Sequence, residues 1–417
     1  MAEQFTQENR AIAITTPLGD DVLLLKAFTL SEELGRPFKC ICELRSINHN
    51  ISYKDIVGQE VSIRLLLEDG TMRYLFGVVS QFGHEGTLAA GRMNHYTAVV
   101  VPALWFLTQT ADCRIFQNKS ARDIVMTVLG DCLGLTVENR LQGSYPVREY
   151  VVQYRESTFD FASRLMEEEG IFYYFEHTEM GATMVLADDP AVHLEVPGLK
   201  EVEFREQDDG TSGEHINEVT RTQRVVPGEF VLRDYDFKVP TKLLESKEQT
   251  GLQQHTMSFL ESYDYPGHYT EKSDGDRYAK LRREEADARH EMLRFSADVR
   301  GLCIGCKFKL AKYPFDALNA SYVIVAQTCR ATSEEFGASG EAAVNHEPPY
   351  RTTFAALPAT TPFRSSPITP RPRISGPQTA FVTGPEGEDI FVDEFGRVKV
   401  QFLWDREGQG NENSSCY

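Results

Sequence analysis

The sequence predicts a mainly β protein with mixed α/β portions. Apolar and polar residues alternate over short runs, as in half-buried strands, and Val61, Ile63 and Leu65 form one such series. Turn residues such as Glu68-Asp69-Gly70 separate these runs. Three stretches instead carry apolar residues at helical spacing. Because the chain has 417 residues, several domains are favoured over one large core.

Residues 1–102 are predicted to form a first tube-like β-barrel region. Alternating apolar residues indicate strands at 61–67 and 74–79, and the turn between them predicts a hairpin. A further strand is expected at 96–101, where Pro102 ends the run. The first region is therefore expected to be built from short antiparallel strands.

Residues 103–214 are predicted to form a mixed α/β region. Ser120 has the character of an N-cap for a helix that ends at Gly130. A second helix is expected from Ser157 to Gly170, since glycine suits the left-handed position after a helix. The aromatic run Ile171–Phe175 follows at once and predicts a strand that is buried on both faces.

Residues 215–335 are predicted to form a second β-barrel region that also contains the longest helix, expected from Asp276 to Asp298. Two segments of this region resemble two segments of the first region: Gly305–Leu310 resembles Gly58–Ile63, and Tyr322–Ala326 resembles Tyr74–Val78. The glycine and the second segment are similarly spaced in both. The pattern leaves open a duplicated barrel unit or two unrelated hairpins.

The last part of the chain is predicted to be a linker followed by a new β domain. Eight of the 19 prolines lie between Pro348 and Pro377, so residues 336–378 are expected to hold no continuous helix or central strand. Residues 379–417 contain short strand signals, among them the alternating run Val398, Val400 and Phe402. This segment is interpreted as the beginning of a small barrel.

Charge and composition exclude several classes of protein. Lys and Arg total 43 against 62 Asp and Glu, and a net charge of −19 disfavours binding to a nucleic-acid phosphate backbone. The first residues lack the pattern of a signal peptide, and no apolar stretch is long enough for a membrane helix. The protein is therefore expected in the cytosol. Its eight scattered cysteines are interpreted as buried thiols.

Three groups of residues raise the question of catalysis or metal binding. Cys303-Ile304-Gly305-Cys306 has the spacing of a zinc or redox site but lacks a second ligand pair, which favours two buried thiols in a hairpin. His290-Glu291-Met292-Leu293-Arg294 has Arg294 where a zinc protease needs histidine. Glu167-Glu168-Glu169 is interpreted as a solvated helix end rather than as an acid–base pair. We therefore assign no catalytic, cofactor-binding or metal-binding residue.

Six separated segments resemble the VgrG family, the spike proteins of type VI secretion systems. They are Asp112–Ser120, Val152–Ser157, Arg164–Ile171, Tyr263–Gly267, Gly376–Ala380 and Asp393–Phe402. The resemblance covers essentially the whole chain. It implies a phage-tail-like hub, then an OB-like barrel that begins at residue 379, and then a β-helical needle whose repeats this sequence does not contain.

The resemblance also implies partners and a location. It implies a homotrimer that sits on the tube of Hcp rings, contacts baseplate proteins, and meets a PAAR-type tip protein and effectors through parts of the protein beyond this sequence. A spike of this kind resides in the bacterial cytoplasm before firing. It is then translocated to the extracellular space or a target cell without a signal peptide, and touches the target membrane only as part of the puncturing device.

Function is expected to be structural, with no enzymatic activity and no cofactor. One alternative is a cell-wall hydrolase or another effector enzyme carried by the spike. A second alternative is ligand binding by the OB-like barrel, since such barrels hold oligonucleotides or sugars in other proteins. The acidic net charge disfavours nucleic acid as that ligand.

Overall fold

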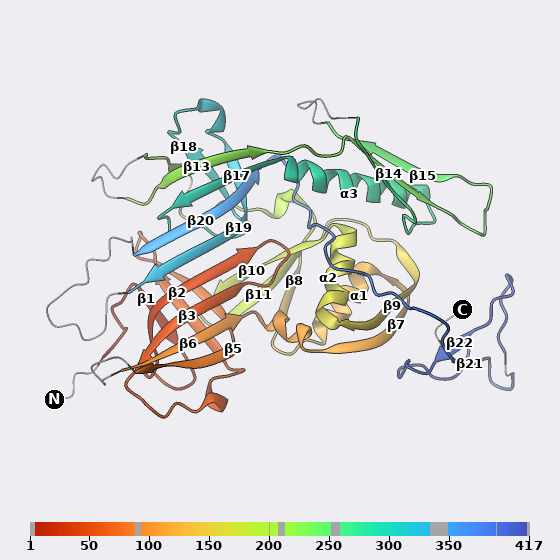
Figure 1. The fold of residues 1–417 in the computed structure, drawn as a ribbon, viewed down its shortest axis with the longest axis horizontal. Helices are drawn as coiled ribbons and strands as arrows, with labels where there is room; N and C mark the ends of the chain where they lie inside the picture. The colour runs from red at the N-terminus through yellow and green to blue at the C-terminus, as the bar shows by residue number, and fades with distance from the viewer. Residues whose placement is uncertain are drawn as a thin grey trace. The chain divides into compact units, whose positions relative to one another are not determined.

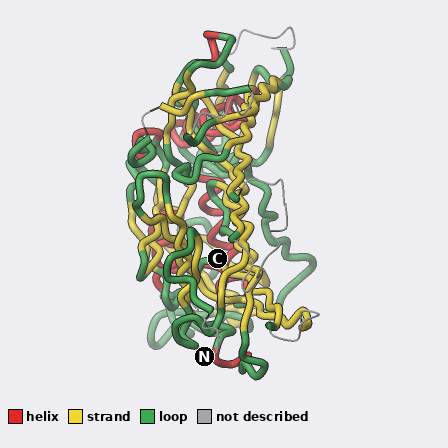
Figure 2. Tube along the Cα trace, turned by 90° about the vertical axis from the view of Figure 1, so that its left-hand side faces the viewer, coloured by secondary structure: helices red, strands yellow, loops and turns green. Residues whose placement is uncertain are grey.

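The computed structural model describes residues 5–87, 93–199, 201–206, 213–251, 259–333, 349–388 and 390–414. Strands and loops make up most of the trace, and helices occupy a few stretches (Figure 2). The predicted fold class, mainly β with α+β portions, is confirmed. Among the described residues, no helix is long and apolar enough to span a bilayer.

The chain divides into two compact units, and neither is continuous in sequence. Unit 1 comprises residues 1–103, 135–142 and 172–365, and unit 2 comprises residues 104–134, 143–171 and 366–417. The predicted middle region, 103–214, therefore contributes to both units. Each unit is described separately below.

A large sheet dominates unit 1. Among the described residues it contains twelve strands, with ten in the order β1-β4-β5-β6-β3-β2-β19-β20-β17-β13 and with β18 and β12 attached beside β19 (Figure 1). The strands are β1 Ile12–Thr15, β2 Leu24–Glu33, β3 Lys39–Ser46, β4 Glu60–Leu66, β5 Met72–Thr87, β6 Asn94–Val101, β12 Glu201–Glu203, β13 Ile216–Gln223, β17 Glu291–Ala297, β18 Lys307–Ala311, β19 Ser321–Thr332 and β20 Tyr350–Pro358.

This sheet consists of two modules with the same strand order. The first module has the order β1-β4-β5-β6-β3-β2, and the second has the order β12-β18-β19-β20-β17-β13. Each strand of one module has a counterpart at the same place in the other, although β1 pairs antiparallel with β4 whereas β12 pairs parallel with β18. Of the two interpretations that the sequence left open, the structure supports the duplicated unit.

Two β-bulges recur at equivalent places in both modules. One follows Val79 in β5 and Ile324 in β19, and the other follows Leu25 in β2 and Ile216 in β13. A bulge adds one residue to one strand and bends it, so unrelated hairpins have no reason to share two of them. The shared bulges fix the residue-by-residue correspondence between the modules.

A left-handed glycine precedes the first strand of each hairpin. Gly58 has φ of +80° and Gly305 has φ of +75°. The N–H of Gly58 donates to the carbonyl oxygen of Val79 (2.8 Å), and the N–H of Gly305 donates to that of Ile324 (2.8 Å). These bonds place Tyr322 level with Gly77 rather than with Tyr74, so the sequence comparison was wrong by three residues at the second strand.

The second module carries an insertion between β13 and β17. It contains the helix α3, Lys272–His290, and a three-stranded sheet of β14 Glu229–Asp234, β15 Leu244–Gln249 and β16 Glu261–Asp264. The predicted helix 276–298 is wrong at its C-terminal end, because Leu293, Phe295 and Ala297 alternate as buried residues of strand β17.

Aromatic side chains form much of the core of the second module. Phe295 in β17 stacks on Phe354 in β20, with ring centroids 4.9 Å apart, and meets Phe308 in β18 edge-on at 5.4 Å. Aromatic pairs in these geometries add roughly 0.5–1.5 kcal/mol beyond their burial. In the first module, Cys40 and Cys42 fill the matching interior as buried free thiols, as predicted.

A small sheet completes unit 1. Its strands are β10 Phe172–Thr178, β11 Gly181–Ala187 and β8 Thr136–Asn139, in the order β10-β11-β8. The first four residues of β10 are buried, which confirms the strand predicted from the aromatic run. Four short 3-10 helices lie along the described chain: η1 Tyr53–Asp55, η2 Ala103–Thr108, η3 Pro190–Val192 and η4 Asp316–Leu318.

Unit 2 consists of a hairpin, two helices and the C-terminal segment. Its elements are β7 Ala111–Ser120, α1 Ala121–Gly130, β9 Val147–Ser157, α2 Thr158–Glu169, β21 Ala380–Val382 and β22 Val400–Phe402. Ser120 and Ser157 cap the helices through their side chains, and Gly170 ends α2 with φ of +73°. Both predicted helices are confirmed with these ends.

Strand β20 corrects the prediction for residues 336–378. It pairs with β19 on one side and β17 on the other, so it is a central strand inside the predicted linker. Pro349 and Pro358 flank a stretch of eight residues without proline. Pro358 is the last residue of strand β20, where a proline interrupts the strand least. Residues 336–348 of the predicted linker lie outside the described part of the chain, and residue 349 is the next residue that the structure describes.

We expect Gly58→Ala to lower the free energy of unfolding by about 1–2 kcal/mol, the cost of a left-handed conformation for a residue with a Cβ. No atom lies within 4 Å of the added Cβ, so the cost comes from the backbone alone. Gly130→Ala, at the end of α1 and equally open, is the control and should be neutral or stabilising. Urea denaturation measures the free energy of unfolding of both variants. Equal effects would contradict the conclusion that Gly58 requires a left-handed conformation.

Candidate functional site

The two modules meet where residues 27–33 of β2 pair antiparallel with residues 326–332 of β19, and we call this junction the seam. Hydrogen bonds extend it at both ends. The N–H of Leu34 donates to the carbonyl oxygen of Val325 (2.9 Å), and the N–H of Ser333 donates to that of Lys26 (2.8 Å). The seam thus joins an end strand of the first module to an inner strand of the second.

A buried ion pair lies at the seam. The Glu32 carboxylate accepts a hydrogen bond from Gln327 Nε2 (2.9 Å) and lies 3.5 Å from Arg73 Nη2. Arg73 also donates through Nη1 to the carbonyl oxygens of Arg300 (3.1 Å) and Leu302 (2.7 Å). Burial raises the pKa of Glu32, while the charge of Arg73 and the bond from Gln327 oppose that rise. Glu32 and Arg73 both belong to the first module, whereas Gln327 and the two carbonyl groups belong to the second, so joining the modules completes the hydrogen bonds around the ion pair.

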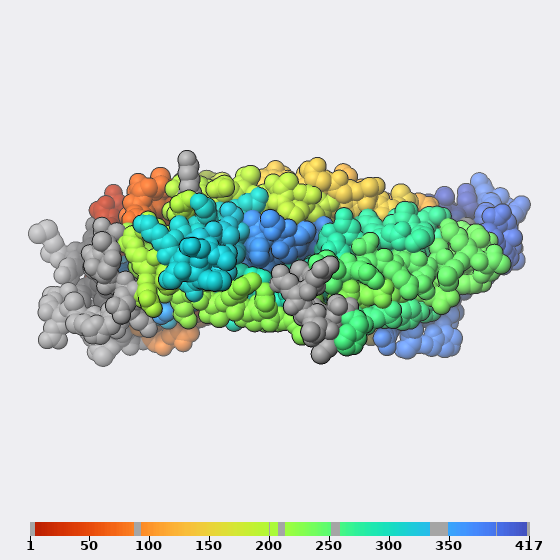
Figure 3. Space-filling model, turned by 90° about the horizontal axis from the view of Figure 1, so that it is seen from above, coloured from red at the N-terminus to blue at the C-terminus, as the bar shows by residue number. Residues whose placement is uncertain are grey.

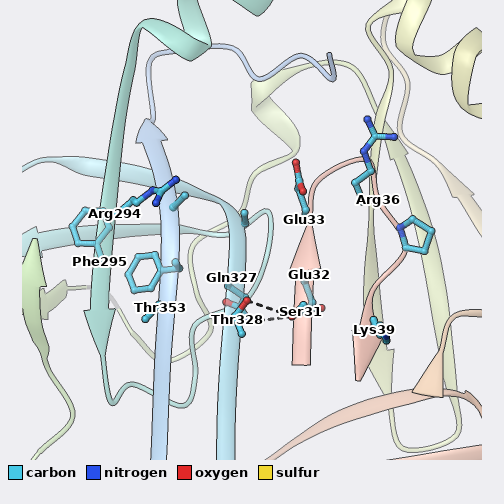
Figure 4. Close-up of a pocket in the computed structure, with 14 residues that line it drawn as sticks. Ser31, Glu32, Glu33, Arg36, Lys39, Arg294, Phe295, Gln327, Thr328 and Thr353 are labelled. Carbon is cyan, nitrogen blue, oxygen red and sulfur yellow. Dashed lines mark hydrogen bonds between the residues drawn. The ribbon is translucent and has the colours of Figure 1, made fainter. Parts of the chain in front are cut away.

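A hollow of about 450 Å³ lies on the sheet across the seam (Figure 4). Ser31 Oγ and Thr328 Oγ1 are 3.3 Å apart there, and small side chains such as Ala326 and Ala355 line the floor. The Glu32 carboxylate beneath is already engaged by Gln327. These two hydrogen bonds connect strands β2 and β19 across the seam.

Cys303 and Cys306 form a disulfide, with Cα atoms 5.7 Å apart. The prediction of two buried thiols is therefore wrong for this pair. The two cysteines bracket the turn at Gly305, where the N–H of Cys306 donates to the carbonyl oxygen of Cys303 (3.3 Å). The first module makes the same turn without a crosslink, since the N–H of Gln59 donates to the carbonyl oxygen of Ile56 (3.2 Å).

The segment His290–Arg294 has no metalloprotease geometry. His290 is the last residue of α3, and Glu291 begins the strand β17, so the five residues do not share a helix. The Nδ1–H of buried His290 donates to the carbonyl oxygen of Arg224 (2.7 Å). Within the described part of the chain, no group of three His, Cys, Asp or Glu side chains is placed to hold a metal ion.

The three glutamates at the end of α2 are covered rather than solvated, so the predicted solvated helix end is wrong. Glu167 accepts hydrogen bonds from Thr369 N–H and Thr369 Oγ1–H, both at 2.9 Å. Glu168 lies 2.9 Å from Arg371 and 3.2 Å from Arg148, which also binds Glu169. Thr369 and Arg371 belong to the proline-rich segment after residue 366 and Arg148 belongs to β9, so the local sequence of α2 does not indicate these partners.

A second set of contacts in unit 2 attaches the C-terminal segment to β9. Gln378 donates through Nε2 to the Tyr154 hydroxyl (2.8 Å) and accepts from Trp404 Nε1 (2.9 Å). The Trp404 ring lies edge-on to Tyr154 at 5.4 Å and stacks on Phe402 at 5.1 Å. Sequence reasoning gave these residues no role, although Tyr154, Gln378 and Phe402 all fall in the segments that resemble VgrG.

The family model for the phage tail baseplate hub (GPD) matches residues 31–335, which is most of the chain. The chain belongs to the phage tail baseplate hub family. The matched residues include most of both modules, the β19 side of the seam and residues 31–33 of its β2 side.

Curated relatives of this hub carry the name predicted from the six segments. The type VI secretion system spike proteins VgrG1b and VgrG1a of Pseudomonas aeruginosa are 39% and 38% identical to it, each over 420 residues and 99% of the chain. The chain spans 55% and 63% of their respective lengths. The resemblance to VgrG is thereby confirmed.

One solved structure has a similar fold. The Escherichia coli c3393 protein, described as a type VI secretion component with structural similarity to the T4 bacteriophage tail proteins gp27 and gp5, matches with a TM-score of 0.69. The match covers 93% of the hub and 88% of that chain at 20% identity. At this identity the comparison supports the fold alone.

We expect Arg73→Met to lower the free energy of unfolding by about 3 kcal/mol at neutral pH, because it leaves the Glu32 carboxylate buried without its cation. This is the low end for a buried pair, since 20% of the Arg73 side chain is exposed. The loss should shrink as the pH falls and Glu32, whose pKa is raised, takes up a proton.

Arg330→Met is the matched control, because Arg330 lies in the seam strand β19 and its contact with Glu43 is exposed. It should change stability by less than about 1 kcal/mol. Urea denaturation at several pH values measures both variants. Equal effects of the two substitutions would show that the Glu32–Arg73 pair does not support the seam.

Replacing both Cys303 and Cys306 by serine should lower the free energy of unfolding by no more than about 2 kcal/mol, because closing so short a loop removes little entropy from the unfolded chain. The first module shows that the turn forms without a crosslink. Thermal unfolding with and without reductant measures the effect. Loss of cooperative unfolding in the double variant would contradict this account.

Proposed function

We propose that this hub is a structural component of a type VI secretion spike and has no catalytic role of its own. The proposal is supported by relatives named as spike proteins, which are similar over 99% of the chain. The polar contacts in the seam, at the end of α2 and around Gln378 hold segments together, as expected of a part that transmits force.

The observation that carries the proposal is the duplicated module. Two similar modules in each chain become six similar surfaces in a homotrimer, which is the arrangement that a threefold spike needs to sit on a tube of hexameric rings. We propose that this tube is built of Hcp rings and that baseplate proteins contact the same assembly. Residues 379–414 then begin an OB-like barrel, attached to β9 through Gln378.

We further propose that the protein resides in the bacterial cytoplasm and is translocated through the system without a cleavable signal. A PAAR-type tip protein and effectors would be carried by parts of the full-length protein beyond this sequence. Nucleic acid is not among the proposed partners, because a net charge of −19 opposes binding to phosphates.

The full-length protein should behave as a trimer in light scattering and should bind purified Hcp rings. A spike without catalytic activity should release no soluble fragments from peptidoglycan. A monomer that fails to bind the tube protein would contradict the proposed role. Fragment release by this 417-residue segment would instead favour an enzyme.

A further inference from the structure

We infer that Cys303 and Cys306 are a reversible redox pair. Their disulfide opens to two thiols, and closes again, by exchange with small thiols of the glutathione class while the protein stays folded. The inference goes beyond the proposed structural role and rests on the residence in the cytoplasm that was proposed with it. It gives the second module a modification site that the equivalent turn of the first module lacks.

A disulfide is unusual in the compartment proposed for this protein. Cytosolic thiols are kept reduced by glutathione and by proteins of the thioredoxin class, and the disulfides that do form there are transient, catalytic or redox-sensing. Other described cysteines of this chain follow that rule, since Cys40, Cys42 and Cys329 are thiols. The crosslink between Cys303 and Cys306 therefore calls for a chemical role.

The pair lies where a small thiol can reach it. Cys303 and Cys306 are both half-buried, whereas Cys40, Cys42 and Cys329 are at most 1% exposed. The cyan segment that contains β18, which begins directly after Cys306, lies on the surface seen in Figure 3. Because exchange requires a thiolate to attack a sulfur atom directly, exposure selects this pair over the buried thiols.

The turn that carries the pair is held by hydrogen bonds that do not involve the sulfur atoms. Gly305 N–H donates to the carbonyl oxygen of Ile324 (2.8 Å), and Ile324 N–H donates to that of Cys306 (3.0 Å). The Nδ1–H of buried His193 donates to the carbonyl oxygen of Gly305 (2.8 Å). Breaking the S–S bond removes none of these three bonds, so the chain can pass between the two redox states without unfolding.

The first module shows that the crosslink is not needed to form the turn. Ile56 and Gln59 occupy the positions of Cys303 and Cys306 and make the same N–H to carbonyl bond. A disulfide that closes so short a loop also adds little stability to the folded chain. A structural crosslink therefore explains the pair poorly, and reversible oxidation accounts for both its position and its exposure.

The exchange proceeds in two balanced steps. A glutathione thiolate attacks one sulfur of the pair, the S–S bond breaks, and the other cysteine leaves as a thiolate that takes up a proton. A second glutathione thiolate then attacks the mixed disulfide and releases the first cysteine, which is also protonated, together with oxidised glutathione. The pair gains two electrons and two protons, and glutathione supplies them. The reverse reaction with oxidised glutathione closes the pair.

Equilibrating the folded 417-residue chain in buffers with graded ratios of reduced to oxidised glutathione tests the inference. Acid quenching, alkylation and peptide mass spectrometry then measure the fraction of Cys303 and Cys306 present as thiols. We expect the ratio of open to closed pairs to change by about tenfold or more across the series, and to return when the buffer is reversed. A pair that stays closed in reduced glutathione, or open in oxidised glutathione, would overturn the inference.

The single variants Cys303→Ser and Cys306→Ser are the matched controls, because each keeps one sulfur of the pair and cannot close. In oxidised glutathione, at least one of them should accumulate the mixed disulfide with glutathione, which its mass identifies. Cys40, Cys42 and Cys329 report on the fold, and each should carry about tenfold less of this adduct because it is buried. No adduct in either variant, or equal adducts on the buried thiols, would overturn the inference.

Failure of this inference and failure of the proposed function have different signatures. A pair that does not exchange with glutathione would leave trimer formation and Hcp binding by the full-length protein unchanged. Loss of Hcp binding by the full-length wild-type protein would contradict the spike role, but it would not alter the glutathione titration of the 417-residue chain.

Discussion

The pairing of β2 with β19 is the interaction on which the rest of unit 1 depends. Without it, each module would have an open edge, and the Glu32 carboxylate would lose the hydrogen bond from Gln327 and keep only Arg73 of its own module. Hydrogen bonds along the seam convert two six-stranded modules into one continuous sheet. The insertion with α3 extends from the second module without interrupting this sheet, because it lies between β13 and β17.

Much of the local structure could be predicted because it depends on nearby residues. Ser120 and Ser157 cap helices, Gly170 ends one, and the Glu68-Asp69-Gly70 turn joins β4 to β5, all within a few residues of the signals that indicate them. The errors arose where distant segments decide the outcome. Strand β17 continues directly from α3 because β13 and β20 bind it on both sides, and β20 is a strand because β17 and β19 flank it.

The residues considered for catalysis or metal binding show the same difference between what nearby residues determine and what distant segments determine. The sequence led us to assign no catalytic role to Cys303, His290 and Glu167, and it did not reveal their partners. Thr369 and Arg371, which cover the end of α2, lie some 200 residues further along the chain. The duplication was visible as a weak resemblance, and only the shared bulges after Val79 and Ile324 established which residues correspond.

The central claim is that the seam between β2 and β19 joins the two modules into one sheet. Hydrogen–deuterium exchange of the backbone amides of the 417-residue chain tests it most directly. The account predicts that the amides of Gln327 and Cys329, which point toward β2, exchange as slowly as amides in the interior of either module. Rapid exchange of these two amides, while the interior amides of both modules stay protected, would contradict it.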